Sequence, residues 1–233
     1  MSSTVNLSKT PALAFVPATR IQQSLVATAE KRALTWLALR TPTYINSDHL
    51  TLLGFISQCL AGLCYALARS NPEMLLVGIG CLVLNWLGDS LDGTLARVRN
   101  RQRPRYGFYV DHITDTVAAF FLTGGLAISG YVHPLIGLGL LIAFLMLSIE
   151  AYLATYTLGR FQMSYWIFGP TEIRILLVIG NISLLRNPTF RILGRQVLIF
   201  DFGGLIAISG MMLMLVVSAI RHTIQLYNEE RIA

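Results

Sequence analysis

Long apolar segments, separated by short polar stretches, follow one another along the chain from about residue 50 to about residue 220. Each segment approaches the roughly 20 residues that an α-helix needs to cross a bilayer. The pattern therefore predicts an all-α integral membrane protein with six transmembrane helices. The predicted spans are residues 50–68, 74–96, 108–129, 134–156, 171–185 and 199–220. Glycines in and beside the later spans are expected to permit close helix packing; they are Gly124, Gly125, Gly130, Gly203, Gly204 and Gly210.

Residues 21–40, ahead of the first span, are predicted to form an amphipathic helix that Pro42 terminates. Such a helix suits the plane of the membrane interface, and a helix packed against protein fits the pattern equally well. Apolar residues recur every fourth position, at Ile21, Leu25, Ala29, Ala33 and Leu37. Polar positions are supplied by Glu30, Lys31, Arg32 and Arg40.

The composition agrees with a membrane protein and adds a preference for anionic partners. Hydrophobic residues make up 54% of the chain and charged residues only 13%, whereas soluble domains are about 25% charged. The net charge of +6 suits an anionic membrane surface and phosphate-bearing ligands. Nucleic acid is a poor candidate partner, because most of the chain must lie in lipid.

Arginine placement predicts the orientation of the chain. The loop between the second and third spans is rich in arginine and should be cytoplasmic. An even number of spans then places both termini in the cytoplasm, in the inner membrane if the cell is bacterial. The loop arginines are Arg97, Arg99, Arg101, Arg103 and Arg105. Opposing them, the predicted outer loop after the fifth span carries Arg186, Arg191 and Arg195.

Four aspartates lie where the second and third spans approach the arginine-rich loop. Each would cost about 2.5–3.5 kcal/mol inside a membrane-spanning helix, so a cluster of them requires cations. Asp89 and Asp92 are three positions apart, and Asp111 and Asp115 are four apart, so each pair shares one helix face. The short loop makes the two helices antiparallel neighbours whose carboxylate pairs can face each other.

Carboxylate oxygens favour hard cations such as magnesium or manganese. Two divalent ions could clamp a diphosphate, and an aspartate at the edge of the cluster could take a proton from an attacking hydroxyl. Gly93 and Ala96 leave room for a nucleotide, Gly107 opens the third span without a side chain, and the loop arginines suit phosphate oxygens. An alternative of another class is a transporter or ion-binding protein that uses the cluster as its transport site.

The spacing Asp89-x2-Asp92-Gly93-x2-Ala96-Arg97-x9-Gly107-x3-Asp111-x3-Asp115 resembles the signature of the class I CDP-alcohol phosphotransferases, also called CDP-alcohol phosphatidyltransferases. All eight fixed positions of that signature are present, and the resemblance covers about residues 20–225. We therefore expect a membrane domain at residues 21–225, a flexible N-terminal tail at residues 1–20 and a C-terminal tail at residues 226–233.

The resemblance also implies the chemistry. Members of the family cleave the pyrophosphate of a CDP-linked alcohol, pass the substituted phosphate to an acceptor hydroxyl and release CMP, in phospholipid biosynthesis. By position, Asp89, Asp92 and Asp111 would be metal ligands, and Asp115 would be both ligand and catalytic base. Gly93 and Ala96 would let cytidine lie close to the helix, and Arg97 would contact its phosphates. The family further implies Mg²⁺ or Mn²⁺, a lipid substrate or product, and a homodimer.

A second family segment, Pro-Asn-x-x-Thr, precedes the first span of many members. Here Ser47, Asp48 and Thr51 occupy the proline, asparagine and threonine positions, so only the threonine matches. The resemblance implies nucleotide contacts from Asp48 and Thr51.

Two sets of residues bear on the substrate. His112, directly after Asp111, and the segment Gly169-Pro170-Thr171-Glu172 resemble choline- and ethanolamine-phosphotransferases of the family. They favour a CDP-choline or CDP-ethanolamine donor, with diacylglycerol or a similar lipid alcohol as acceptor. Arg160 and Arg174 suit instead a CDP-diacylglycerol donor whose acceptor carries a phosphate, such as an inositol or glycerol phosphate. A structural ion pair between Arg174 and Glu172 or Glu150 is equally consistent with the sequence.

Overall fold

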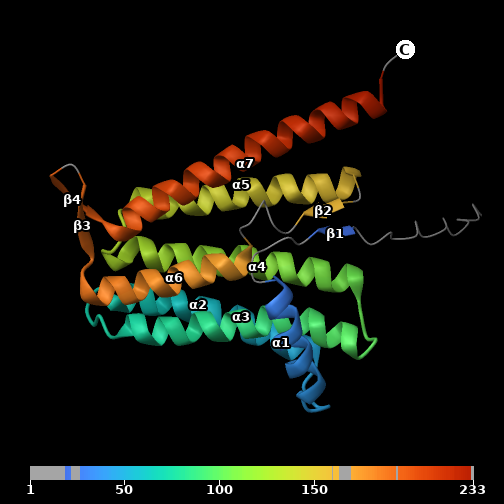
Figure 1. The fold of residues 1–233 in the computed structure, drawn as a ribbon, viewed down its shortest axis with the longest axis horizontal. Coiled ribbons are helices and arrows are strands. Elements are labelled where there is room, and N and C mark those ends of the chain that lie inside the picture. Colours follow the sequence, from blue (N-terminus) through green and yellow to red (C-terminus); the bar gives the residue numbers. More distant parts are fainter. Residues whose placement is uncertain (1–18, 22–26, 159, 163–168, 193, 232–233) are drawn as a thin grey trace, which may run out of the picture.

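The computed structural model describes residues 19–21, 27–158, 160–162, 169–192 and 194–231. Long helices run lengthwise through the molecule, and α1 crosses them near one end (Figure 1). The helices are α1 (Ala27–Arg40), α2 (Ser47–Ala68), α3 (Met74–Val98), α4 (Pro104–Ser129), α5 (Pro134–Leu158), α6 (Pro170–Arg186) and α7 (Ile199–Glu229). The strands are β1 (Thr19–Ile21), β2 (Arg160–Gln162), β3 (Thr189–Ile192) and β4 (Arg195–Leu198).

Every predicted span lies in a helix of the structure. Four of these helices, α2, α3, α5 and α7, are long and apolar enough to cross a membrane, so the chain is a multi-pass integral membrane protein. Helix α7 extends beyond the sixth predicted span to Glu229, so residues 226–229 of the predicted C-terminal tail are helical.

The N-terminal helix begins later than predicted. Residues 19–21 form β1, which pairs in parallel with β2, and α1 starts at Ala27. The rest of the predicted tail, residues 1–18, and residues 22–26 lie outside the described part of the chain. Leu34 and Ala38 are buried in a cluster with α3, whereas Ala33 is exposed. The packed face is thus offset by one residue from the predicted series, because α1 has apolar residues on more than one side and its contact with α3 selects among them.

The distribution of polar and apolar groups is that of a protein with lipid as its solvent. Helices α5 and α7 lie side by side and expose many large apolar side chains, including Leu138 and Leu213. One polar pair lies inside: the buried Tyr65 hydroxyl donates to Asn181 Oδ1 at 2.8 Å. Lipid offers no hydrogen bonds, so internal pairing of such groups is required.

Helix α2 is held between α3 and α4 by glycines that permit backbone contact. A Cβ atom added at Gly88 would lie 2.5 Å from the backbone nitrogen of Gly54, and one at Gly125 would lie 1.9 Å from the carbonyl oxygen of Gly62. Both distances are far inside van der Waals contact. These two contacts set the positions of α3 and α4 relative to α2, and therefore the positions of the aspartates that follow Gly88 on α3 and precede Gly125 on α4.

Candidate active site

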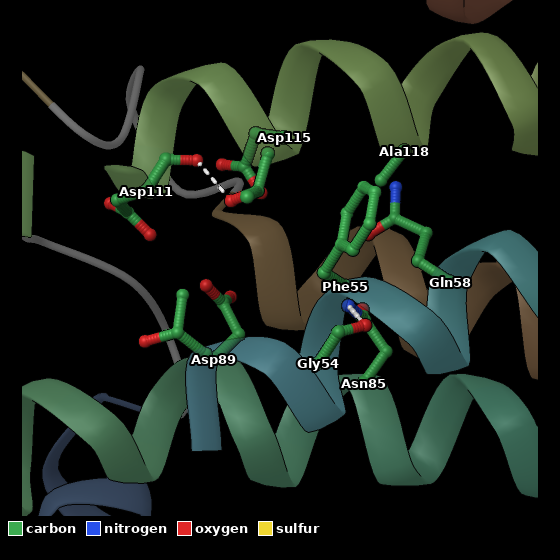
Figure 2. A pocket seen from close by; sticks show the side chains of 10 residues that line it. Gly54, Phe55, Gln58, Asn85, Asp89, Asp111, Asp115 and Ala118 are labelled. Carbon is green, nitrogen blue, oxygen red and sulfur yellow. Dashed lines mark hydrogen bonds between the residues drawn. The ribbon is translucent and has the colours of Figure 1, made fainter. Parts of the chain in front are cut away.

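Three of the four predicted aspartates converge. Asp89 of α3 points across a gap toward Asp111 and Asp115 of α4 (Figure 2), and one carboxylate oxygen from each lies within 4.8 Å of the others. These carboxylates line a small cavity of about 10 Å³, which is about the size of one water molecule. Its remaining lining comes from Thr51, Gly54, Phe55, Gln58, Asn85, Thr114 and Ala118. The structure thus brings together three carboxylates that are up to 26 positions apart in the sequence.

The donor set fits a divalent cation. Three carboxylates supply only hard oxygen ligands, the type that magnesium and manganese prefer. Their mutual repulsion at this separation favours occupation by positive charge. Asp89, Asp111 and Asp115 are therefore the residues that could hold such an ion.

Arg174 of α6 supplies a fixed positive charge beside this cluster. Its Nη2 donates to Asp89 Oδ2 at 2.7 Å, and its Nε donates to Asn85 Oδ1, also at 2.7 Å. Both members of the Arg174–Asp89 ion pair are largely shielded, with 14% and 26% of their side chains exposed, so solvent weakens the pair less than a surface pair.

The predicted structural pairs of Arg174 are wrong. Glu172 Oε2 instead accepts a hydrogen bond from the backbone nitrogen of Gly169 at 2.9 Å, at the start of α6. Glu150 on α5 lies 2.6 Å from His222 Nδ1 on α7. Arg174 lies on the face of α6 that packs against α3, so its partners are Asp89 and Asn85 and neither glutamate.

Asp92 lies outside the group of three and turns toward α2. Thr51 Oγ1 donates to Asp92 Oδ2 at 2.6 Å, the other carboxylate oxygen accepts from the backbone nitrogen of Gly93, and Ser47 Oγ donates to the Asp92 carbonyl at 2.9 Å. Asn46 caps α2 by accepting from the His49 backbone nitrogen, which fixes the helix start and the first-turn positions of these groups. Two residues that were separately predicted to belong to the site, Thr51 and Asp92, are thus in direct contact.

A second, larger cavity of about 340 Å³ lies at the α3–α4 connection. The small side chain of Ala96 lines it, and Asp48 forms an ion pair with Arg103 at its wall. The remaining lining is Asn46, Ser47, Leu95, Arg99, Arg101 and Gln102. Three arginines against one aspartate give the lining a net positive charge that suits an anionic ligand, although Arg99 donates to the backbone carbonyls of Thr41, Pro42 and Ile45.

Two further predicted site residues, Arg97 and Gly107, line neither cavity. Arg97 Nη2 donates to Thr94 Oγ1 at 3.0 Å near the end of α3. Gly107 is exposed on the second turn of α4, with open space where a side chain would be. Arg160 lies in β2, and its side chain is outside the described part of the structure.

His112 is held by packing as well as by polar contacts. Its Nδ1 lies 2.7 Å from the carbonyl oxygen of Phe108 and 3.6 Å from Asp111 Oδ2. The ring stacks on Phe108 at 4.1 Å and meets Tyr152 of α5 edge to face at 5.0 Å. His112 therefore joins α4 to α5 directly beside the carboxylate cluster.

Sequence reasoning missed Asn85. It is buried, donates through Nδ2 to the Gly54 carbonyl at 3.0 Å and accepts from Arg174. The signal was present, because Asn85 is a polar residue inside an apolar span, one helical turn before Asp89. It joins α2, α3 and α6 at the edge of the cluster.

Fold and site together define a multi-pass membrane protein with an internal carboxylate cluster beside an arginine-lined cavity. The family model for CDP-alcohol phosphatidyltransferase matches residues 45–224, and the chain belongs to this family. It is therefore a transferase that passes a phosphate group from a CDP-alcohol in phospholipid synthesis, within a family that generally depends on divalent metal. A comparison with curated proteins finds no match.

Proposed function

We propose that the chain catalyses metal-dependent transfer of a substituted phosphate from CDP-choline or CDP-ethanolamine to a diacylglycerol-type hydroxyl, with release of CMP. The observation that carries the reaction type is the convergence of Asp89, Asp111 and Asp115 within the family-matched segment. The donor preference is supported by His112 beside Asp111 and by the Gly169–Glu172 segment at the start of α6.

Asp115 is proposed as the base. The acceptor oxygen forms a new bond to the phosphorus that carries the alcohol, the bond from that phosphorus to the bridging oxygen breaks, and CMP leaves. The hydroxyl proton passes to a carboxylate oxygen of Asp115. Asp111 is the neighbouring carboxylate one turn earlier, and its position allows His112 to orient it.

The remaining residues bind and orient. Asp89, Asp111 and Asp115 would hold one divalent ion, and Asp92 would complete the ligand set for a second ion toward α2. The ions, when bound, supply positive charge that stabilises the diphosphate and the leaving CMP. Ala96, Gly93 and Arg97 would hold the nucleotide, with Asp48, Thr51 and Gly107 at its boundary. The size of the arginine-lined cavity supports this assignment.

The membrane arrangement proposed for this function has six spans. Helices α4 and α6 would cross the bilayer with the four more apolar helices, because they lie alongside α2 and α3 in the same bundle (Figure 1). Helix α1 would lie at the cytoplasmic interface, where the arginine-rich connection and the site would also lie; in a bacterial cell this would be the inner membrane. Residues 21–225 would form the working domain, and two copies of it would form a homodimer.

A second donor class is also supported by a particular contact. Arg174 reaches the carboxylate cluster, and an arginine there could bind the phosphate of a polyol phosphate acceptor, with Arg160 as a further cation. In that case CDP-diacylglycerol would be the donor, and its phosphatidyl group would be transferred to the polyol phosphate.

We expect purified protein to release CMP from CDP-choline or CDP-ethanolamine when diacylglycerol is supplied in micelles. EDTA should abolish the release, and Mg²⁺ or Mn²⁺ should restore it. The measurement is CMP by chromatography together with product mass. Parallel reactions pair CDP-diacylglycerol with glycerol phosphate and with inositol phosphate. Products from these reactions alone would overturn the donor assignment, and CMP release unaffected by EDTA would overturn the metal dependence.

A further inference from the structure

Glu30 on α1 makes an unusual set of contacts with two helices of the site. A single carboxylate oxygen, Oε1, accepts from Trp86 Nε1 at 2.7 Å, from Thr171 Oγ1 at 2.8 Å and from Ser90 Oγ at 3.2 Å. The sequence pattern had assigned Glu30 to the polar face of an interfacial helix. The structure instead turns it inward, where one acceptor joins α1, α3 and α6.

The three donors neighbour the residues of the site. Ser90 directly follows Asp89 on α3, and Thr171 is one helical turn before Arg174 on α6. Because residues three apart share a helix face, Thr171 and Arg174 lie on the same side of α6. Thr171 is held by Glu30, and Arg174 reaches Asp89 and Asn85.

The hydrogen bonds accepted by Glu30 are of a kind that can hold helices together. A carboxylate oxygen accepts charge-assisted hydrogen bonds, which are stronger than those between neutral groups. The three hydrogen-bond partners Trp86, Ser90 and Thr171 are neutral donors, so in this contact the charge of Glu30 is shared among hydrogen bonds across the α1–α3–α6 junction. Lys31, the next residue, is exposed.

We propose that Glu30 is a positioning residue for the transfer reaction. It holds the start of α6 against α3, so that the Arg174 guanidinium stays on Asp89 and Asn85 while the substrates react. This assignment rests on the proposed function, in which Asp89 is a metal ligand. The hydrogen bonds of Glu30 go to Trp86, Ser90 and Thr171 and not to the clustered carboxylates, so Glu30 acts through Arg174.

The test compares Glu30→Ala, Glu30→Gln and the adjacent control Lys31→Ala in CMP release. Glu30→Ala should lower kcat about ten-fold, as expected for a misplaced reacting group, and leave the KM for the CDP-alcohol within about two-fold. Glu30→Gln keeps the accepting oxygen and should recover most of the wild-type kcat. Lys31→Ala should match the wild type. Glu30→Ala equal to Lys31→Ala, or Glu30→Gln as poor as Glu30→Ala, would overturn the proposal.

Coupling to Arg174 separates positioning from general stabilisation. Lysine at position 174 lacks the guanidinium that donates to both Asn85 and Asp89. In an Arg174→Lys background, adding Glu30→Ala should therefore change kcat less than two-fold. Independent, multiplying losses would contradict the proposal. Thr171→Val removes one donor and should act in the same direction as Glu30→Ala, with a smaller loss, so the comparison survives if Glu30→Ala does not fold.

A spectroscopic readout needs neither substrate nor metal. With Trp36 and Trp166 replaced by phenylalanine, the emission of Trp86 reports on its indole N–H. Glu30→Ala should shift this emission, and Glu30→Gln and Lys31→Ala should not; an unshifted Glu30→Ala would overturn the contact. If wild-type protein releases no CMP from any donor, the proposed function fails. If it turns over and the Glu30 variants are normal, only the present inference fails.

Discussion

Replacing Asp115 with asparagine should reduce CMP release by about 10²–10⁴-fold, the usual contribution of a general base. The amide is nearly the same size as the carboxylate, but it cannot take the proton of the acceptor hydroxyl and is a weaker ligand for a divalent cation. Asp115 lies in the three-carboxylate cluster on α4, so the substitution removes charge from the centre of the proposed site. The measurement is the initial rate at saturating CDP-alcohol and Mg²⁺.

Asp201→Asn is the matched control for this experiment. Asp201 lies in the first turn of α7 and accepts from the backbone nitrogen of His133 at 2.6 Å, away from the cluster residues. We expect this variant to keep the wild-type rate per folded molecule. An Asp115→Asn protein that folds and turns over at the same rate as Asp201→Asn would remove Asp115 from its assigned role.

Gly125→Ala should strongly destabilise the fold. The new Cβ atom would lie 1.9 Å from the carbonyl oxygen of Gly62, and backbone cannot rotate out of the way as a flexible side chain can. Helices α2 and α4 would have to separate, at a cost of about 1–3 kcal/mol or more for overpacking. Thermal unfolding followed by size-exclusion chromatography in detergent should show a clear fall in Tm.

Gly124→Ala controls for the change from glycine to alanine in the same helix. A Cβ atom at Gly124 has nothing within 4 Å, so its Tm should stay near the wild-type value or rise slightly. Equal Tm values for the two variants would show that α2 and α4 do not approach at Gly62 and Gly125, and would contradict the packing that positions the aspartates.

Much of the site could be predicted because its spacing is local. Asp111 and Asp115 share a face by helix geometry alone, and the short arginine-rich connection makes α3 and α4 neighbours. The spacing could not predict that Asp89 and Asp92 would have different partners. Both lie at the same end of α3, but α2 packs close at Gly54 and Gly88, so Asp92 meets Thr51 while Asp89 faces α4.

Contacts between distant segments were the least predictable. Arg174 is 85 positions from Asp89, and Glu30 is 141 positions from Thr171, so no local pattern identifies these partners. The glycines illustrate the same limit. Close packing is confirmed at Gly125 and Gly204, where a Cβ would meet a neighbouring helix, and Gly130 instead ends α4 with φ of 82°. Open space surrounds the Cβ positions of the other three, which are Gly124, Gly203 and Gly210.

The most direct test of the central claim is anomalous diffraction from crystals of the protein grown with Mn²⁺ and a CDP-alcohol. The account predicts a manganese peak coordinated by Asp89, Asp111 and Asp115, with the diphosphate of the nucleotide against it. Manganese bound elsewhere, or a nucleotide bound without metal and away from these three carboxylates, would contradict the account.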